Sequence, residues 1–252
     1  MSDEAGLILL VIAGATFFGA IAKGAVNLGL NLLAVPAMAP LVGVPTAVLT
    51  IFIGKALSDF VLVYESCAED ALTESRRVMP FLLLGCAGAV GGTALLAHLD
   101  RDILFVLLGG VILVFVTLDY VGRAITIPPG QERYWAPIAG LVSGVSQGLT
   151  GAAGPTIAIY MLSLKLTTRE FVFLTSVIFI AINAGQFAGI LYLDLYTETR
   201  LLYAVAALAP ILLGTWVGIR LRARLTSLGF RRMILIILTL MALNLLRLGI
   251  VG

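Results

Sequence analysis

The stretch FGAIAKGAVNLGLNLLAVPAM, residues 18–38, decides the fold because it places helix-breaking residues inside strongly apolar sequence. Gly and Pro weaken a helix by about 1 and about 3 kcal/mol relative to Ala. Five Gly, Asn and Pro residues lie close together here: Gly24, Asn27, Gly29, Asn31 and Pro36. The stretch therefore predicts opened backbone, which a hydrocarbon layer tolerates only where protein or water surrounds it.

The composition of the whole chain predicts an all-α polytopic membrane protein. Of its 252 residues 60% are hydrophobic and 12% are charged, and the mean hydropathy is +1.09. Soluble domains are only about half apolar. A helical crossing needs about 20 apolar residues, so this length allows at most about ten spans and leaves little for a soluble domain.

Ten apolar segments can be distinguished, and their length and uniform polarity favour helices over the alternating strands of a barrel. They are Gly6–Ala22, Leu28–Val44, Pro45–Tyr64, Met79–Ala97, Ile103–Val121, Trp135–Thr150, Ala152–Leu164, Phe171–Leu193, Leu201–Ile219 and Met233–Ile250. We expect 8–10 transmembrane helices, because the first two segments, or the sixth and seventh, could re-enter the membrane instead of crossing it.

The distribution of Lys and Arg predicts the orientation, since basic residues next to a span resist translocation. With the N-terminus outside, the basic residues kept on the outer side are Arg101, Arg200 and Arg247. The cytoplasmic side receives Lys23, Arg76, Arg77, Arg123, Arg133, Lys165, Arg169, Arg220, Arg222, Arg224, Arg231 and Arg232. We therefore expect a bacterial cytoplasmic (inner) membrane protein with both termini in the periplasm.

The segment pattern predicts two inverted five-segment repeats, residues 1–126 and 127–252. A shift of 124 positions places GAVNLGLNLLAVPAM (Gly24–Met38) on GLTGAAGPTIAIYML (Gly148–Leu162). Five segments is an odd number, so the second half must enter the membrane from the opposite side. Few residues are identical, and the repeat rests on the matching segment lengths and breaks. We expect the broken or re-entrant helices to meet at the interface of the repeats.

Paired helix breaks favour the binding site of a transporter with an anionic substrate, because helix N-termini present free N–H groups to anions. In the second half the break contains Gly148, Thr150, Gly151, Gly154 and Pro155. The alternative is that glycines only let helices pack closely. Packing is the favoured interpretation for the sets spaced by four residues: Gly140, Gly144 and Gly148; Gly185 and Gly189; Gly214 and Gly218.

Two charged residues, Lys55 and Asp59, fall inside the third segment on one helical face. A charge at the bilayer centre costs roughly 2.5 to 3.5 kcal/mol, so such residues face a cavity or each other. We predict that Lys55 attracts the anion and that Asp59 carries a proton; a mutually neutralising pair is the alternative. The 124-residue shift places Asp59 on Asn183.

Other polar residues complete the candidate site. Lys23 either binds the substrate or snorkels to the interface, and the amides of Asn183 and Gln186 either bind it or join helices. The predicted substrate-binding residues are Lys23, Gly24, Asn27, Gly29, Asn31, Lys55, Gln147, Gly148, Thr150, Gly151, Gly154, Asn183 and Gln186, and Asp59 is the predicted proton-coupling residue.

Other classes of function have little support. Cys67 and Cys86 lack metal-ligand spacing, so we expect no metal and no cofactor, and the dispersed net charge of +2 argues against nucleic acid. Gly144–Gly148 matches the G-x-S-x-G pattern of hydrolases, but His98 is expected at the far end of its span and we expect no enzyme. The expected partners are a small anion and the bilayer, and a homodimer is allowed for.

The two glycine-rich openings, Phe18–Thr50 and Gly140–Ser176, resemble those of the TauE/SafE family of sulfite exporters, also called the 4-toluene sulfonate uptake permease family. The resemblance implies transport of sulfite, sulfonates or related organosulfur anions, with the site between the two repeats. From the paired breaks we expect a secondary transporter that works by alternating access. Asn27 and Asn31 replace glycines that are usual in that family. Transport of small carboxylates and an anion channel remain alternatives, because the same donors would serve other anions.

Overall fold

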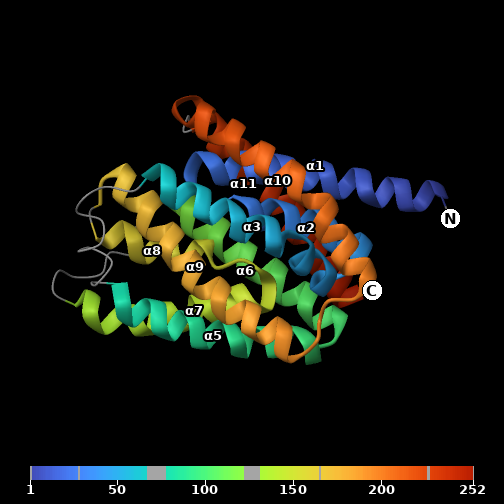
Figure 1. Cartoon of the computed structure of the whole chain (residues 1–252), viewed down its shortest axis with the longest axis horizontal. Coiled ribbons are helices and arrows are strands. Elements are labelled where there is room, and N and C mark those ends of the chain that lie inside the picture. The colour runs from blue at the N-terminus through green and yellow to red at the C-terminus, as the bar shows by residue number, and fades with distance from the viewer. Residues whose placement is uncertain are drawn as a thin grey trace. The chain divides into compact units, whose positions relative to one another are not determined.

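The computed structural model describes residues 2–27, 29–66, 78–121, 131–164, 166–225 and 228–251, and within these it contains helices and no strand (Figure 1). The helices are α1 (Ser2–Val26), α2 (Leu30–Val42), α3 (Val44–Ser66), α5 (Met79–His98), α6 (Arg101–Val121), α7 (Glu132–Thr150), α8 (Gly154–Ser163), α9 (Thr168–Tyr192), α10 (Glu198–Leu225) and α11 (Leu228–Val251). They agree with the predicted segments within a few residues, which confirms the all-α membrane fold. Cys67, Arg76, Arg77, Arg123 and Lys165 lie outside the described residues.

Helix length separates the elements that can span a bilayer from those that cannot. Seven described helices are long and apolar enough to cross: α1, α3, α5, α6, α9, α10 and α11. With a rise of 1.5 Å per residue, the 13 residues of α2 reach about 20 Å and the 10 residues of α8 about 15 Å. Both are shorter than a hydrocarbon core of about 30 Å. The chain is therefore a multi-pass membrane protein with a short helix after each predicted break.

Helix boundaries recur at a constant spacing in the two halves. The end of α1 and the end of α7 are 124 positions apart, and so are the starts of α2 and α8 and the starts of α3 and α9. Few residues are identical between these regions, so the agreement lies in where the backbone starts and stops. It supports a repeat, while the inverted orientation and the halves 1–126 and 127–252 stay predictions.

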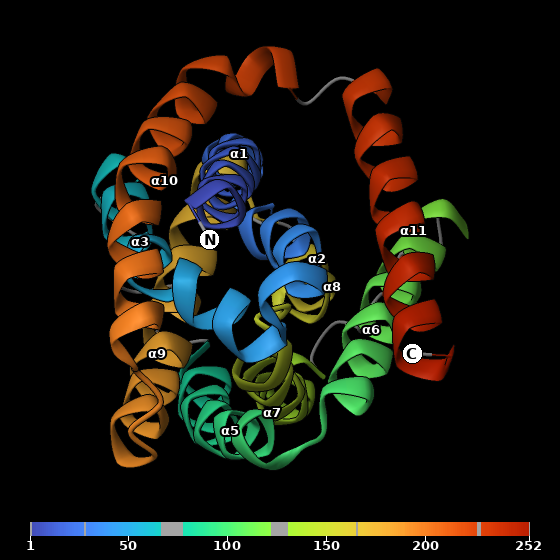
Figure 2. The same ribbon diagram turned by 90° about the vertical axis from the view of Figure 1, so that its right-hand side faces the viewer.

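The helices pack into two compact units, each drawn from both halves of the sequence. Unit 1 contains Met1–Ser58, Leu99–Val121 and Tyr196–Gly252, and unit 2 contains Asp59–His98 and Gly122–Leu195. In unit 1, α1 packs against α2 and α10, while α2 also contacts α6 and α11 (Figure 2). The half-buried Tyr196 hydroxyl donates to the Leu49 carbonyl oxygen at 2.9 Å, and partial burial raises the pKa of Tyr196.

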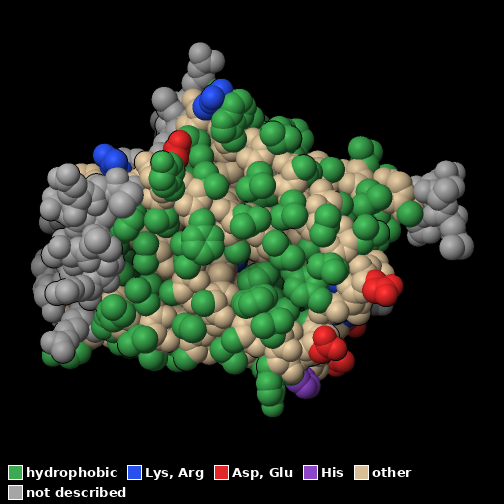
Figure 3. Space-filling model, in the orientation of Figure 1, with side chains coloured by type: hydrophobic (Ala, Val, Ile, Leu, Met, Phe, Trp, Pro, Cys, Tyr) green, Lys and Arg blue, Asp and Glu red, His purple; other side chains and the backbone are tan. Residues whose placement is uncertain are grey.

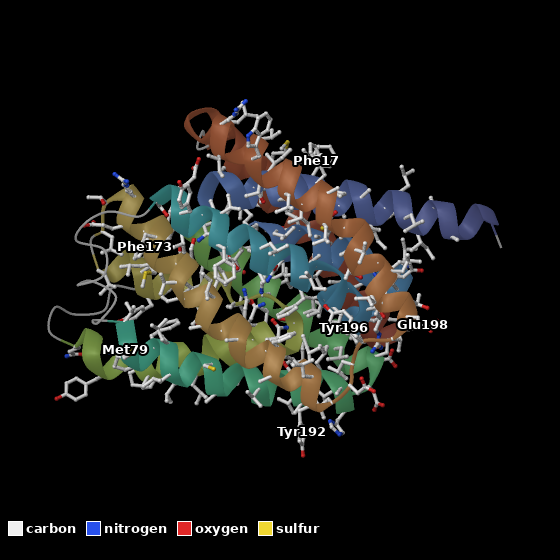
Figure 4. All side chains as sticks on the ribbon, in the orientation of Figure 1. Phe17, Met79, Phe173, Tyr192, Tyr196 and Glu198 are labelled. Atoms are coloured by element: carbon white, nitrogen blue, oxygen red, sulfur yellow. The ribbon has the colours of Figure 1, made fainter. Side chains whose placement is uncertain are left out.

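In unit 2, α5 lies between α7 and α9, and α8 packs against α7 and α9. Figure 4 shows Met79 and Phe173 at one end of this unit and Tyr192 at the other. A capping box starts α9: the Thr167 N–H donates to Glu170 Oε2 at 2.7 Å, and the Glu170 N–H donates to Thr167 Oγ1 at 3.3 Å. This box satisfies donors that the first turn of a helix leaves free.

The described surface suits a lipid environment. Hydrophobic side chains dominate the face drawn in Figure 3. Four strongly exposed tyrosines lie within three residues of a helix end: Tyr64, Tyr120, Tyr134 and Tyr192. Tyr is enriched where the headgroups meet the hydrocarbon, because its ring is apolar and its hydroxyl is polar. Their positions agree with helices that end near the two membrane surfaces.

Glycines bring helix backbones into direct contact. A Cβ atom added to Gly88 of α5 would lie 2.6 Å from the Leu141 carbonyl oxygen of α7, and one added to Gly144 would overlap the Gly85 carbonyl oxygen. In α10, a Cβ on Gly218 would lie 2.9 Å from the Gly24 Cα of α1. The packing interpretation of the regularly spaced glycines is therefore supported at Gly140, Gly144, Gly148, Gly185, Gly189, Gly214 and Gly218.

Gly88→Ala should lower the thermal unfolding temperature of the purified protein, because the added methyl group overpacks the α5–α7 contact at a cost of about 1–3 kcal/mol. Gly91→Ala is the matched control on the same helix, since nothing lies within 4 Å of its added Cβ atom. Ala is a better helix former than Gly, so the control should unfold at the same or a higher temperature. Equal unfolding temperatures for the two variants would contradict this packing.

Candidate functional site

The first predicted break is a single left-handed residue that ends α1. Asn27 has φ 61°, and its N–H donates to the Lys23 carbonyl oxygen at 2.6 Å. Gly151 ends α7 in the same way, with φ 74° and an N–H that donates to the Gln147 carbonyl oxygen at 2.9 Å. A left-handed residue with this bond closes a helix and turns the chain. Asn27 and Gly151 are equivalent under the 124-residue shift, so both halves break at the same point.

The turn after α1 holds a buried ammonium group. The side chain of Lys23 is only 3% exposed, and its Nζ donates to Asn27 Oδ1 at 3.2 Å. Lys23 therefore does not snorkel to an interface, as one alternative had it, and it does not contribute a loop charge to the orientation. A Cβ on Gly29 would overlap Ala22, so the chain folds back tightly, and Asn31 is buried in the first turn of α2.

A second buried ammonium group of unit 1 lies on α3. Lys55 is 2% exposed and follows Gly54, where an added Cβ would lie 2.6 Å from Ile211 Cδ1 of α10. Gly24, which follows Lys23, packs against α10 as well, with its added Cβ 2.9 Å from the Ile219 nitrogen. Helix α10 therefore contacts α1 at Gly24 and α3 at Gly54, the residues next in sequence to the two buried lysines.

In unit 2 the corresponding turn is built from amides instead of a charge. Gln147 Nε2 donates to Gln186 Oε1 at 3.1 Å, and Gln186 Nε2 donates to the Gln147 carbonyl oxygen at 3.3 Å. This carbonyl also accepts the bond from Gly151, so α9 caps the end of α7. Thr150 Oγ1 donates to the Ser146 carbonyl oxygen at 2.9 Å and accepts from the Ala152 N–H at 3.3 Å.

The other two predicted glycines of this turn have separate positions. A Cβ on Gly148 would lie 2.5 Å from the Thr93 nitrogen, so Gly148 packs against α5. Gly154 is buried at the first position of α8, three residues after the left-handed Gly151. Gly148 and Gly24 thus share a packing role in their units, and Gly154 starts a short helix.

The predicted proton carrier of unit 2 has a defined partner. Asp59 is 0% exposed, and its Oδ2 accepts a hydrogen bond from Asn183 Nδ2 at 2.9 Å. The two residues are 124 positions apart, so each is the repeat equivalent of the other. Equivalent positions of a two-fold arrangement touch each other only near its axis, so this bond adds support for the repeat. Asn183 Oδ1 is buried and has no hydrogen-bond partner.

The buried charges leave a positive surplus. In the part of the chain that the structure describes, the buried charged residues are Lys23, Lys55 and Asp59. This set contains two cations and one anion, and an interior of low dielectric strengthens electrostatic interactions between such groups. The described residues contain no group of His, Cys, Asp and Glu that could hold a metal ion.

The predicted residues thus divide between the two units. Those of unit 1, called the turn cluster below, are Lys23, Gly24, Asn27, Gly29, Asn31 and Lys55, and those of unit 2 are Asp59, Gln147, Gly148, Thr150, Gly151, Gly154, Asn183 and Gln186. Thr215 was not among the residues predicted from the sequence. It is buried and follows Gly214 on the α10 face that packs against α1. The sequence signal for Thr215 was its hydroxyl group between Gly214 and Gly218, the pair of glycines predicted to pack against a neighbouring helix.

Broken helices, a buried positive surplus and a lipid-facing exterior define a polytopic membrane protein of the anion-transporter type. The family model described as Sulfite exporter TauE/SafE matches residues 11–245. The chain therefore belongs to the sulfite exporter TauE/SafE family, whose members are membrane transporters and not enzymes. No curated protein and no solved structure matches the chain significantly.

Asn27→Ala should lower the unfolding temperature, because a residue with a Cβ costs about 1–2 kcal/mol in the left-handed region when it lacks a local side-chain hydrogen bond. Asn27→Gly is the matched control, since Gly adopts φ 61° without that strain. Both variants lose the hydrogen bond from Lys23 to Asn27, so the control should unfold at a higher temperature than Asn27→Ala in a thermal scan. If both variants unfold together, the left-handed turn is not a requirement of the fold.

The hydrogen bond between Asp59 and Asn183 can be measured with a double-mutant cycle of Asp59→Asn and Asn183→Ala. Contacting residues show coupling of about 0.5–3 kcal/mol, whereas separate residues add. Each single variant should unfold at a lower temperature, and the double variant should lose less than the sum of the two. Strict additivity would show that the two side chains do not interact.

Proposed function

We propose that this protein is a secondary transporter that moves a small organosulfur anion, sulfite or a sulfonate, across the bacterial cytoplasmic membrane by alternating access. Its family and the surplus of buried positive charge support this assignment. The positive-inside rule supports periplasmic termini.

The observation that carries the proposal is the pair of buried ammonium groups in unit 1, Lys23 beside the α1 turn and Lys55 on α3. An ammonium group offers three N–H donors, and the oxygens of sulfite and sulfonates are acceptors. Charge-assisted bonds of this kind are about twice as strong as neutral ones. Carboxylates accept the same bonds, so a small carboxylate is the second candidate substrate.

Asp59 provides a physical route for proton coupling. It lies one helical turn after Lys55 on the continuous helix α3. Protonation of this carboxylate would raise the buried positive charge and so strengthen the binding of the anion, and the linkage is reciprocal. A negative-inside potential opposes anion uptake by about 2.3 kcal/mol per charge per 100 mV. Export can therefore run without coupling, whereas uptake needs a cation such as this proton.

Transport in proteoliposomes tests the function. Sulfite, ethanesulfonate and acetate should be compared for saturable flux and counterflow, which distinguish a carrier from the alternative, an anion channel. Lys23→Met and Lys55→Met should each raise KM for the transported anion about tenfold or more, since a hydrogen bond to a charged group contributes about 1.5–3 kcal/mol. Arg247→Gln is the control, because this exposed cation on α11 lies outside the turn cluster.

Asp59→Asn should abolish the dependence of transport on a pH gradient and leave counterflow intact, because the amide cannot release a proton. Proton-driven uptake that persists in this variant would remove Asp59 from the mechanism. Flux that neither saturates nor shows counterflow would favour the channel, and no flux of any of the three anions would contradict the proposed function.

A further inference from the structure

Two buried hydroxyl groups depart from the pattern that the others share. The remaining buried Ser and Thr side chains of the described residues each donate to a carbonyl oxygen three or four positions earlier: Thr16, Thr50, Ser58, Ser66, Thr93, Thr150, Thr175 and Ser176. This local bond is the usual way for a helix to satisfy a hydroxyl group away from water. Ser143 Oγ and Thr215 Oγ1 are buried and have no hydrogen-bond partner.

An unpaired hydroxyl group is costly to bury. Removing such a group from water without a replacement bond destabilises the folded state. Thr215 is 1% exposed, and it could make the usual bond to its own helix as its counterparts do. A donor that is held unpaired in a protein interior marks a place where a ligand or an ordered water supplies the partner.

The place of Thr215 in unit 1 favours an anion as the ligand. A Cβ on Gly24 would overlap the Thr215 carbonyl oxygen, so Thr215 touches the last turn of α1 at the residue after Lys23. Ile211 lies one turn before Thr215 on α10, and it packs against Gly54, the residue before Lys55. Residues four positions apart share a face of a helix. Thr215 therefore lies on the α10 face that passes both buried lysines of unit 1.

We propose that Thr215 is a specificity-determining residue that donates its hydroxyl hydrogen to an oxygen of the bound sulfite or sulfonate, beside the ammonium groups of Lys23 and Lys55. The proposal rests on the proposed function and adds a neutral donor to the site. Sulfite and sulfonates carry three acceptor oxygens, so a hydroxyl donor complements the two cations. Natural proteins keep a destabilising group where function requires it, which accounts for the unpaired hydroxyl.

Ser143 does not support an equivalent site. It lies on α7 of unit 2, and the buried charged residue of that unit, within the described part of the chain, is Asp59. A carboxylate repels an anion. The difference in buried charge between the two units agrees with an anion bound at the turn cluster of unit 1.

The test compares Thr215→Val, which removes the hydroxyl and keeps the shape, with Thr215→Ser, which keeps the hydroxyl. Thr16→Val is the matched control, because Thr16 is equally buried and donates to the Ile12 carbonyl oxygen at 2.6 Å. Unfolding temperatures without ligand and Kd values for sulfite and ethanesulfonate are measured on the full-length protein in detergent.

Without ligand, Thr215→Val should unfold at the same or a higher temperature than the parent, because it removes an unpaired polar group, while Thr16→Val should unfold at a lower temperature. Thr215→Val should also raise the Kd for the bound anion about tenfold, because one hydrogen bond to the anion is lost. Thr215→Ser and Thr16→Val should leave this Kd within about threefold of the parent value.

A lower unfolding temperature of Thr215→Val without ligand would overturn the inference, because the hydroxyl would then have a structural partner. An unchanged Kd in Thr215→Val would overturn it as well, and would leave the proposed function intact if the parent protein binds the anion. A parent protein that binds neither anion would contradict the proposed function, and with it the substrate assigned to Thr215.

Discussion

A helix inside a hydrocarbon layer can stop only where its freed backbone groups find partners, and this constraint governs the structure. The chain meets it twice, with Asn27 after α1 and Gly151 after α7, each in the left-handed region and each bonded back to the carbonyl four residues earlier. The short helices α2 and α8 follow directly from these turns. Polar side chains accompany both turns, with Lys23 and Asn27 at the first and Gln147, Thr150 and Gln186 at the second.

The two turns have the same backbone conformation and differ in their side chains. Lys23 is bonded to Asn27 in the first turn, whereas Gln147 is bonded to Gln186 in the second. One turn therefore places a cation at its end, and the other places a neutral amide. With Lys55 buried in the same unit as Lys23, the positive charge gathers in unit 1. This division of charge distinguishes the two similar backbones, and the proposed function assigns the anion to unit 1 and the proton carrier Asp59 to unit 2.

Much of this arrangement could be predicted from the sequence. Each break was visible because Gly, Asn and Pro interrupt apolar sequence, and the 124-residue shift paired Asp59 with Asn183 before their hydrogen bond was known. These predictions depended on residue types and on their spacing along the chain. The packing of α1 on α10 could not be predicted, because it depends on glycines more than 190 positions apart, such as Gly24 and Gly218, whose complementary faces appear only in three dimensions.

Two side chains of the site also required the structure. Lys23 stands at the end of an apolar run, where a sequence cannot distinguish a snorkelling lysine from a buried one. In sequence Thr215 resembles the other hydroxyl residues of membrane helices, and only the structure shows that its buried oxygen has no hydrogen-bond partner. Helical periodicity and composition predict neither the burial of Lys23 nor the missing hydrogen-bond partner of Thr215. Such residues are set by packing between distant segments, which is the part of a fold that local pattern specifies least.

The central claim is that a negatively charged solute binds beside the α1 turn of unit 1. An anomalous difference map of crystals grown with 2-bromoethanesulfonate tests it most directly, because bromine marks the ligand without relying on its shape. We predict a bromine peak next to Lys23, Lys55 and Thr215, with the sulfonate oxygens bonded to these side chains. Crystals that bind the compound elsewhere would contradict the account.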